Sequence, residues 1–178
     1  NTGTGLPLTP SWSYEVNKSS TKLGSAISAA GDINGDGFDD FLAGAVEYDI
    51  TTFDNYGKCL LFYGSPLGLP ASPNWEYIGD YEEGRLGAIV ATVGDINGDN
   101  FDDFIVSQPY YDDGTSGFAH KGRLLLFYGS PTGPDSTYNW QFTGSTTGAE
   151  ATNGYAAGYI GDVNNDGYNE IMIGSYSY

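Results

Sequence analysis

Short apolar runs that alternate with clusters of turn-forming residues set the pattern of this chain. In its best-defined stretch the runs cover residues 23–31, 40–46, 58–63 and 74–78, and Gly, Pro, Asn and Asp fill the gaps. Residues 59–63 form a nearly continuous apolar run, which is typical of a strand covered on both faces. No amphipathic stretch of the usual helix length interrupts this pattern. The pattern therefore predicts an all-β fold in which sheets of short antiparallel strands stack on one another.

An acidic nine-residue loop recurs three times between these runs. We name the copies loop 1 (residues 32–40), loop 2 (residues 95–103) and loop 3 (residues 162–170). Each has oxygen-bearing side chains at positions 1, 3, 5 and 9, with Gly or Asn at position 6, where a tight turn needs a left-handed residue. A single cluster of this kind is common in ordinary turns. Three copies in register indicate a metal-binding loop instead.

The spacing of the oxygen atoms favours calcium. Calcium takes six to eight oxygen ligands at roughly 2.3 to 2.6 Å, so alternate residues of a curling loop must turn inward. His and Cys, the usual ligands of zinc, copper and iron–sulfur centres, are absent from the loops, and magnesium demands a stricter octahedron. With the carbonyl of position 7 included, the predicted ligands of about three calcium ions are Asp32, Asn34, Asp36, Phe38 and Asp40; Asp95, Asn97, Asp99, Phe101 and Asp103; and Asp162, Asn164, Asp166, Tyr168 and Glu170.

The helix-loop-helix calcium hand is a competing interpretation. Its loop begins in the same way, but it needs Glu at the twelfth position. That position is held by Ala43, Val106 and Ile173, and the flanking residues read as strands. We therefore reject the calcium hand.

The loops belong to a longer repeat. Trp12, Trp75 and Trp140 precede the first aspartate of their loops by 20, 20 and 22 residues. Repeats of this kind are typical of solenoids and propellers. We expect a single domain over residues 1–178, with a leading strand at 11–16 and repeats at about 23–78, 86–143 and 153–178. Only the first two repeats have four strands.

This pattern resembles the FG-GAP repeat of integrin alpha-chain β-propellers and of many bacterial surface proteins. The resemblance rests on Gly-Asp-x-Asn-x-Asp-Gly-x-x-Asp followed by a hydrophobic strand ending in Gly-Ala, and it extends from about Trp12 to Ser175. It implies one four-stranded blade per repeat, with calcium in the hairpin loop between the first two strands. Within the loops two positions depart from the pattern, because Asn100 replaces the loop glycine in loop 2 and Glu170 the final aspartate in loop 3; the Gly-Ala pair is replaced by Ser107-Gln108 and Gly174-Ser175 in the second and third repeats.

Three repeats cannot close a propeller ring, which typically has four to eight blades. The chain is therefore expected to be a fragment of a larger propeller, or an oligomer in which other copies complete the ring or pair with its exposed edges. The leading strand has two alternatives. It completes the unfinished last blade of another molecule by strand addition, or it folds back on the first blade of its own chain.

Charge narrows the choice of partners and of setting. The net charge is −17 with only six Lys and Arg, which makes nucleic acid and anionic membranes poor partners. No membrane-inserted segment is predicted. Three calcium ions add six positive charges and would bring the formal charge from −17 to −11. Millimolar calcium outside the cell saturates even weak sites of about 10⁻⁴ M, so an extracellular or cell-surface setting is expected.

Catalytic chemistry is not indicated. The single histidine, His120, lies in a polar connection, and neither a nucleophile elbow nor a phosphate loop is present. The acidic pairs Glu82-Glu83 and Asp112-Asp113 fit solvent-facing turns better than a glycosidase site. We predict a non-enzymatic, calcium-binding module for adhesion or recognition of a protein or glycan. The alternative is a self-assembling subunit of a surface layer or filament.

Overall fold

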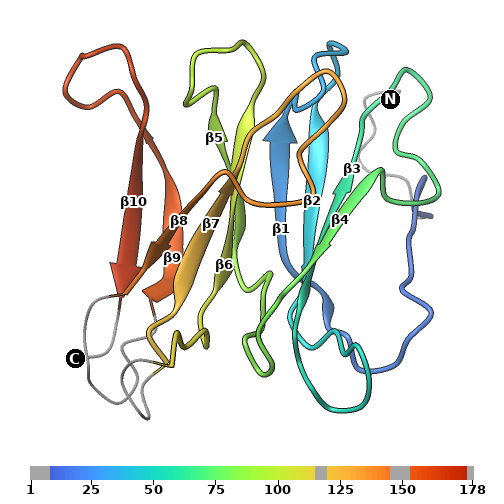
Figure 1. Ribbon diagram of the computed structural model, residues 1–178. Coiled ribbons are helices and arrows are strands. Elements are labelled where there is room, and N and C mark those ends of the chain that lie inside the picture. Colours follow the sequence, from blue (N-terminus) through green and yellow to red (C-terminus); the bar gives the residue numbers. More distant parts are fainter. Residues whose placement is uncertain (1–8, 115–119, 145–152, 176–178) are drawn as a thin grey trace.

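The fold is all-β, as predicted. The computed structural model describes residues 9–114, 120–144 and 153–175 (Figure 1). Its strands are β1 (Leu23–Gly31), β2 (Asp40–Ala45), β3 (Lys58–Phe62), β4 (Trp75–Ile78), β5 (Val90–Gly94), β6 (Asp103–Gln108), β7 (Arg123–Phe127), β8 (Trp140–Thr143), β9 (Asn153–Gly161) and β10 (Glu170–Ser175). Across these residues, no helix has the length and apolarity needed to cross a bilayer.

The strands form three antiparallel sheets in chain order. Sheet 1 has the order β1-β2-β3-β4 and sheet 2 has the order β5-β6-β7-β8, whereas sheet 3 contains only β9 and β10. The sheets stand face to face in a row, with β1, β5 and β9 as neighbours (Figure 1). This arrangement confirms the prediction of four-stranded, propeller-like blades in an incomplete ring.

The hydrophobic core lies between the sheets. Leu42 and Leu61 of sheet 1 pack with Phe104 and Phe127 of sheet 2 in one buried cluster. A second cluster joins the opposite face of sheet 2, through residues such as Ile105, to partly buried side chains of sheet 3. Because both faces of sheet 2 are covered, every residue of β7 is buried, and β3 is equally buried. This burial explains the continuous apolar runs in the sequence.

Aromatic residues of β4, the outer strand of sheet 1, pack on sheet 2. Trp75 of β4 meets Phe104 and Phe127 of sheet 2 edge to face, with ring centroids 5.5 and 5.0 Å apart. Its indole Nε1 donates a hydrogen bond of 3.0 Å to the carbonyl of Asp135. The fourth strand of sheet 1 thus contributes to the core of sheet 2, and these contacts join the two blades.

The predicted leading strand at 11–16 is wrong, because these residues pair with no strand in the part of the chain that the structure describes. They lie instead on the outer face of sheet 1, where Trp12 and Tyr14 contact Phe62 at centroid distances of 5.2 and 5.0 Å. Trp12 Nε1 donates a hydrogen bond of 2.8 Å to the carbonyl of Pro70. The indole of Trp75 makes the corresponding bond to the carbonyl of Asp135 in the β7–β8 connection of sheet 2. The alternation of apolar and polar residues here comes from one-sided packing of an extended segment. Of the two alternatives, the segment folds back on its own first blade.

Candidate metal centres

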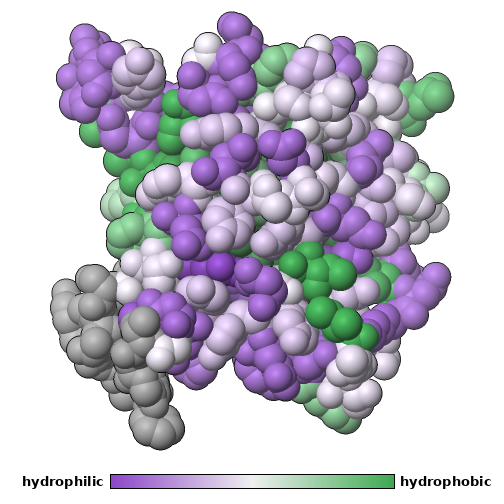
Figure 2. All heavy atoms as spheres, viewed as in Figure 1, coloured by the Kyte–Doolittle hydropathy of each residue, from purple (hydrophilic) through white to green (hydrophobic). Residues whose placement is uncertain are grey.

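The three acidic loops lie at the same end of the three sheets (Figure 1). Each connects the first two strands of its sheet, and the residue at position 9 pairs across the hairpin with the glycine that precedes position 1. Those pairs are Gly31 with Asp40, Gly94 with Asp103 and Gly161 with Glu170. The repeated register gives the loops equivalent positions, and hydrophilic residues cover the tips of loops 2 and 3 (Figure 2).

The side chains of positions 1, 3 and 5 turn into each loop in the same way. The amide of position 5 donates to the position 1 carboxylate at 3.0 Å in all three loops, and also to the side-chain oxygen of position 3. The amide of position 6 donates to the other position 1 oxygen at 2.8, 2.8 and 2.9 Å. Since each carboxylate oxygen has about two lone-pair sites, these bonds orient the oxygens and leave acceptor capacity for a cation.

Left-handed backbone angles close the loops, as predicted for position 6. There φ is +88° at Gly37, +71° at Asn100 and +92° at Gly167, so asparagine replaces glycine in loop 2 without changing the turn. Position 4 is also left-handed in all three loops, which the sequence analysis did not identify; φ at Asn165, for example, is +58°. The left-handed residues at positions 4 and 6 let the chain wrap tightly enough for alternate side chains to face inward.

Position 9 is buried in the first two loops. Asp40 and Asp103 are 2% and 0% exposed, and each uses its two carboxylate oxygens to accept one backbone amide apiece, all at 2.9 Å. Burial raises the pKa of both carboxyls to about 6 against the opposing effect of these amide bonds, and the neighbouring loop aspartates raise it further. A cation held in the loop would oppose that shift, because positive charge favours the ionised carboxylate.

Loop 3 gathers its carboxylates most closely. Asp162, Asp166 and Glu170 each place one oxygen within 4.8 Å of the others, and within the described ranges no other group of His, Cys, Asp or Glu side chains does so. Glu170 Oε2 accepts the amide of Val163 at 2.7 Å, in the manner of Asp40 and Asp103. The extra methylene of Glu170 therefore preserves this contact.

Positive charge is missing from this end of the molecule. Eleven carboxylates belong to the loops, nine at positions 1, 5 and 9 together with Asp39 and Asp102 at position 8. All six Lys and Arg lie at the opposite end, in the segments before β1, β5 and β7 or at the start of β3 and β7. Five of them form ion pairs there. The donor set, all oxygen and strongly anionic, fits a hard divalent cation.

Hydrogen bonds bring the side chains of positions 1, 3 and 5 together in every loop, and in loop 3 the position 9 carboxylate joins those of positions 1 and 5. The ligand roles, including those of the position 7 carbonyls, remain a prediction. Sequence reasoning missed two other sets of residues. Gly64 and Gly129 hold the buried carboxylates of Asp40 and Asp103 through their amides, and both lie in the repeated Tyr-Gly-Ser-Pro segment that was visible in the sequence. Asp102 and Asn169, at position 8, contact the preceding loop. No signal within one loop could have revealed those contacts.

Comparison with known proteins agrees with this architecture. The model of the FG-GAP repeat family matches residues 23–57 and 86–127, which contain loops 1 and 2. The chain is an FG-GAP repeat protein. It is 35% identical to integrin alpha-PS2 of Drosophila melanogaster over 165 residues, which cover 84% of this chain. It is 32% identical to integrin alpha-IIb of Mus musculus over 159 residues, which cover 83% of this chain.

The chain is also similar to a relative that is not an integrin. The chain is 30% identical to phosphatidylinositol-glycan-specific phospholipase D of Bos taurus over 189 aligned positions, which cover 97% of this chain. The part aligned with this chain spans only 11%, 14% and 21% of the lengths of these three relatives, respectively. The shared feature is therefore the FG-GAP module, related to the repeat region of integrin alpha chains.

Proposed function

We propose that this FG-GAP protein is a calcium-stabilised, extracellular recognition module that binds a protein or glycan partner and has no catalytic role of its own. In this proposal each of the three loops holds one calcium ion. The ions stiffen the hairpins at one end of the sheets, and the remaining surface is free to meet the partner.

The observation that carries the proposal is the charge arrangement around the loops. Oxygen atoms of the same type take the same positions three times, and no Lys or Arg lies near enough to neutralise them. A bound cation stabilises the folded state according to its concentration relative to its dissociation constant. At a hundredfold excess each ion contributes roughly 2.7 kcal/mol.

The recognition role is supported by the relatives and by the chemistry of the described surface. Two of the relatives are named as integrins, and the overall charge of −17 disfavours nucleic acid and anionic membranes. The single histidine, His120, is engaged by Tyr110 through a 3.0 Å contact between Nδ1 and the carbonyl and through an edge-to-face ring contact. That setting supports a structural duty better than proton transfer.

A calcium titration with matched variants tests the proposal. We expect the melting temperature of the protein to rise with calcium and to fall to its starting value when EDTA is added. Asp166→Ala should remove part of the rise. Asp135→Ala should leave it unchanged, because Asp135 is an acidic residue at the same end but outside the loops. A melting temperature indifferent to calcium would contradict the proposal.

For the recognition role, immobilised protein is tested against an array of extracellular proteins and glycans in calcium and in EDTA, and calcium-dependent retention is expected.

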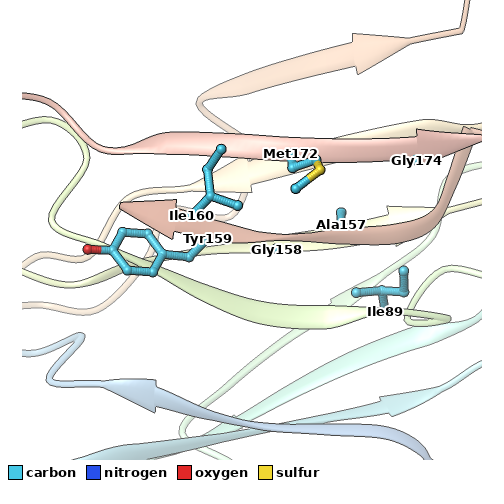
Figure 3. A pocket seen from close by; sticks show the side chains of 7 residues that line it. All are labelled: Ile89, Ala157, Gly158, Tyr159, Ile160, Met172 and Gly174. Carbon is cyan, nitrogen blue, oxygen red and sulfur yellow. The ribbon is translucent and has the colours of Figure 1, made fainter. Parts of the chain in front are cut away.

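Self-assembly is the second candidate function, and one observation favours it. Sheet 3 carries an open apolar cavity of about 330 Å³, lined by Ile89 from the β4–β5 connection and by residues of β9 and β10 (Figure 3). Met172 and Tyr159 beside it are 58% and 49% exposed, and Trp140 of β8 is 44% exposed. In sheet 2 the equivalent face of the blade is covered. A second copy of the chain, with its own apolar blade face, is the occupant that assembly requires.

Sedimentation velocity separates the two candidates. Assembly predicts that the weight-average mass rises with protein concentration and that Met172→Ser abolishes the rise. Leu67→Ser is the matched control, because Leu67 is 98% exposed but lies in the β3–β4 connection, away from the cavity. A monomer at all concentrations, together with a retained heterologous partner, supports recognition instead.

A further inference from the structure

We propose that calcium binding to neighbouring loops is cooperative and that Asp102 is the positioning residue that couples loop 1 to loop 2. The inference rests on the proposed calcium binding and goes beyond it. It assigns a role to position 8 of the loop, which is not among the predicted ligands.

Asp102 grips the backbone of the first ligand residue of loop 1 from both sides. Its Oδ2 accepts the amide of Asp32 at 2.7 Å, and its own amide donates to the carbonyl of Asp32 at 3.1 Å. A carboxylate acceptor makes the first of these a charge-assisted hydrogen bond, which is stronger than a neutral one. The geometry of Asp32, and with it the position 1 carboxylate, therefore depends on where loop 2 places Asp102.

Glycine immediately before loop 1 makes room for this contact. Gly31 precedes Asp32, and a Cβ atom there would overlap the carboxylate of Asp102. Gly94 occupies the same place before loop 2, and a Cβ atom there would lie 3.4 Å from Nδ2 of Asn169, the position 8 residue of loop 3. Gly31 thus accommodates the position 8 side chain of the following loop, whereas at Gly94 the contact is an ordinary one; both glycines also allow the left-handed turn, for which φ is +75° and +64°.

The peptide unit between Phe101 and Asp102 belongs to both loops. Its carbonyl is the predicted position 7 ligand of loop 2, and its N–H is the group that donates to Asp32 in loop 1. A cation that fixes the carbonyl also orients the N–H, and hydrogen bonds in such chains polarise one another. Phe101 adds a packing contact, because its ring fills the space beside Gly35 of loop 1.

Coupling follows because ordering one loop reduces the entropy that the other must lose on binding. Loop 2 closed on its ion holds Asp102 in place, and Asp102 in turn holds Asp32 ready for the ion of loop 1. Typical coupling between sites changes affinity about 5- to 150-fold, and the change is reciprocal. Loops 2 and 3 are joined more weakly, since Asn169 Nδ2 donates to the carbonyl of Asp95 at a longer distance of 3.3 Å.

The chain offers a matched control at the same loop position. Asp39 is position 8 of loop 1, its side chain is exposed, and its carboxylate makes no hydrogen bond within the described part of the chain. No loop precedes loop 1 in the described residues, so Asp39 has no equivalent of Asp32 to hold. Removal of its carboxylate changes the charge at position 8 without touching a neighbouring loop.

The test is a calorimetric titration with calcium alone, in a protein whose loop 3 is disabled by Asp166→Ala. In this two-site protein, disabling loop 2 by Asp99→Ala should weaken calcium binding at loop 1 at least about 5-fold. The reciprocal variant, Asp36→Ala, should weaken loop 2 by the same factor. Asp102→Ala should reduce both factors to less than about 2-fold, whereas Asp39→Ala should leave them unchanged.

Near-ultraviolet circular dichroism in saturating calcium shows whether Asp102→Ala is still folded. If it is not, Asp102→Asn is the variant that tests the inference. The amide oxygen of asparagine can still accept the Asp32 N–H, so most of the coupling should be retained. Sites that bind calcium independently in the two-site protein, or coupling that survives Asp102→Ala, would overturn the inference alone. Absence of calcium binding in the unaltered protein would overturn the proposed function with it.

Discussion

The two ends of the sheets differ in whether their charged side chains have partners of opposite charge. At the end opposite the loops, Arg123 is 1% exposed, yet its guanidinium is fully engaged. It donates to Gln108 at 2.8 Å and to Gln141 at 3.3 Å, pairs with Asp80, and lies 3.9 Å from the ring centroid of Tyr111. At the loop end, eleven carboxylates have no Lys or Arg among them. The buried cation at one end has its counter-charge within the chain, whereas the loop carboxylates at the other end have none nearby.

This difference shows where the fold depends on its surroundings. The buried guanidinium of Arg123 has polar partners from three separate segments, so its loss is costly whether or not calcium is present, because these partners are parts of the protein. The loop carboxylates repel one another unless an ion from solution joins them. The stability of the loop end should therefore follow calcium concentration, and that of the opposite end should not.

Removal of calcium should have the largest effect. With three sites, each at a hundredfold excess of calcium over its dissociation constant, chelation is expected to cost roughly 2.7 kcal/mol per site, or about 8 kcal/mol in total. For a domain of this size, that loss lowers the melting temperature by roughly 20 °C. Differential scanning calorimetry in calcium and in EDTA measures it. Equal melting temperatures in the two buffers would show that the stability of the loop end does not depend on calcium, and would contradict the proposed difference between the two ends.

Arg123→Met should have the next largest effect, at the opposite end. It leaves Gln108 and Asp80 without their cationic partner, while Gln108 Nε2 is already buried without a hydrogen-bond partner among the described residues. We expect a loss of about 3 kcal/mol in the free energy of unfolding, measured by urea denaturation. The loss should be the same in calcium and in EDTA. A loss that depends on calcium would show that the two ends are not independent.

A single loop substitution should cost less than chelation and should depend fully on calcium. Asp99→Ala removes the position 5 oxygens of loop 2, so roughly 2.7 kcal/mol of stabilisation is lost in excess calcium. In EDTA the same substitution should be nearly neutral, because it also removes repulsion between carboxylates. Urea denaturation in both buffers gives the comparison, and an equal cost in both would assign Asp99 a purely structural role.

An exposed ion pair should show the smallest effect. Lys22 and Glu47 lie 2.6 Å apart at the end opposite the loops, but the Lys22 side chain is 62% exposed. Lys22→Met should change the free energy of unfolding by less than about 0.5 kcal/mol, and added salt should reduce even that. A larger change would mean that pairing at this end matters irrespective of burial, and the contrast with Arg123 would be lost.

The repetition along the chain made much of the fold predictable. The strands within the repeats were located from the alternation of apolar runs and turn residues, and the loops from oxygen-bearing residues at fixed intervals. The left-handed residue at position 6 was predicted correctly even for Asn100, since asparagine tolerates this backbone region. Local rules were sufficient because these features depend on neighbours in the sequence.

Features that depend on the stacking of sheets were not predictable in this way. Residues 11–16 alternate like a strand, but only the three-dimensional structure shows that they lie on sheet 1 without pairing. Asp102 looks like any acidic loop residue until sheet 2 places it against Asp32, 70 positions away in the chain. Likewise, the partners of Arg123 come from separate segments that no spacing rule connects.

Native mass spectrometry of the protein in millimolar calcium tests the central claim most directly. Three bound calcium ions are expected, and Asp36→Ala, Asp99→Ala and Asp166→Ala should each remove one ion, whereas Asp135→Ala should remove none. A protein that carries no calcium under these conditions, or whose ion count ignores all three loop substitutions, would contradict the account.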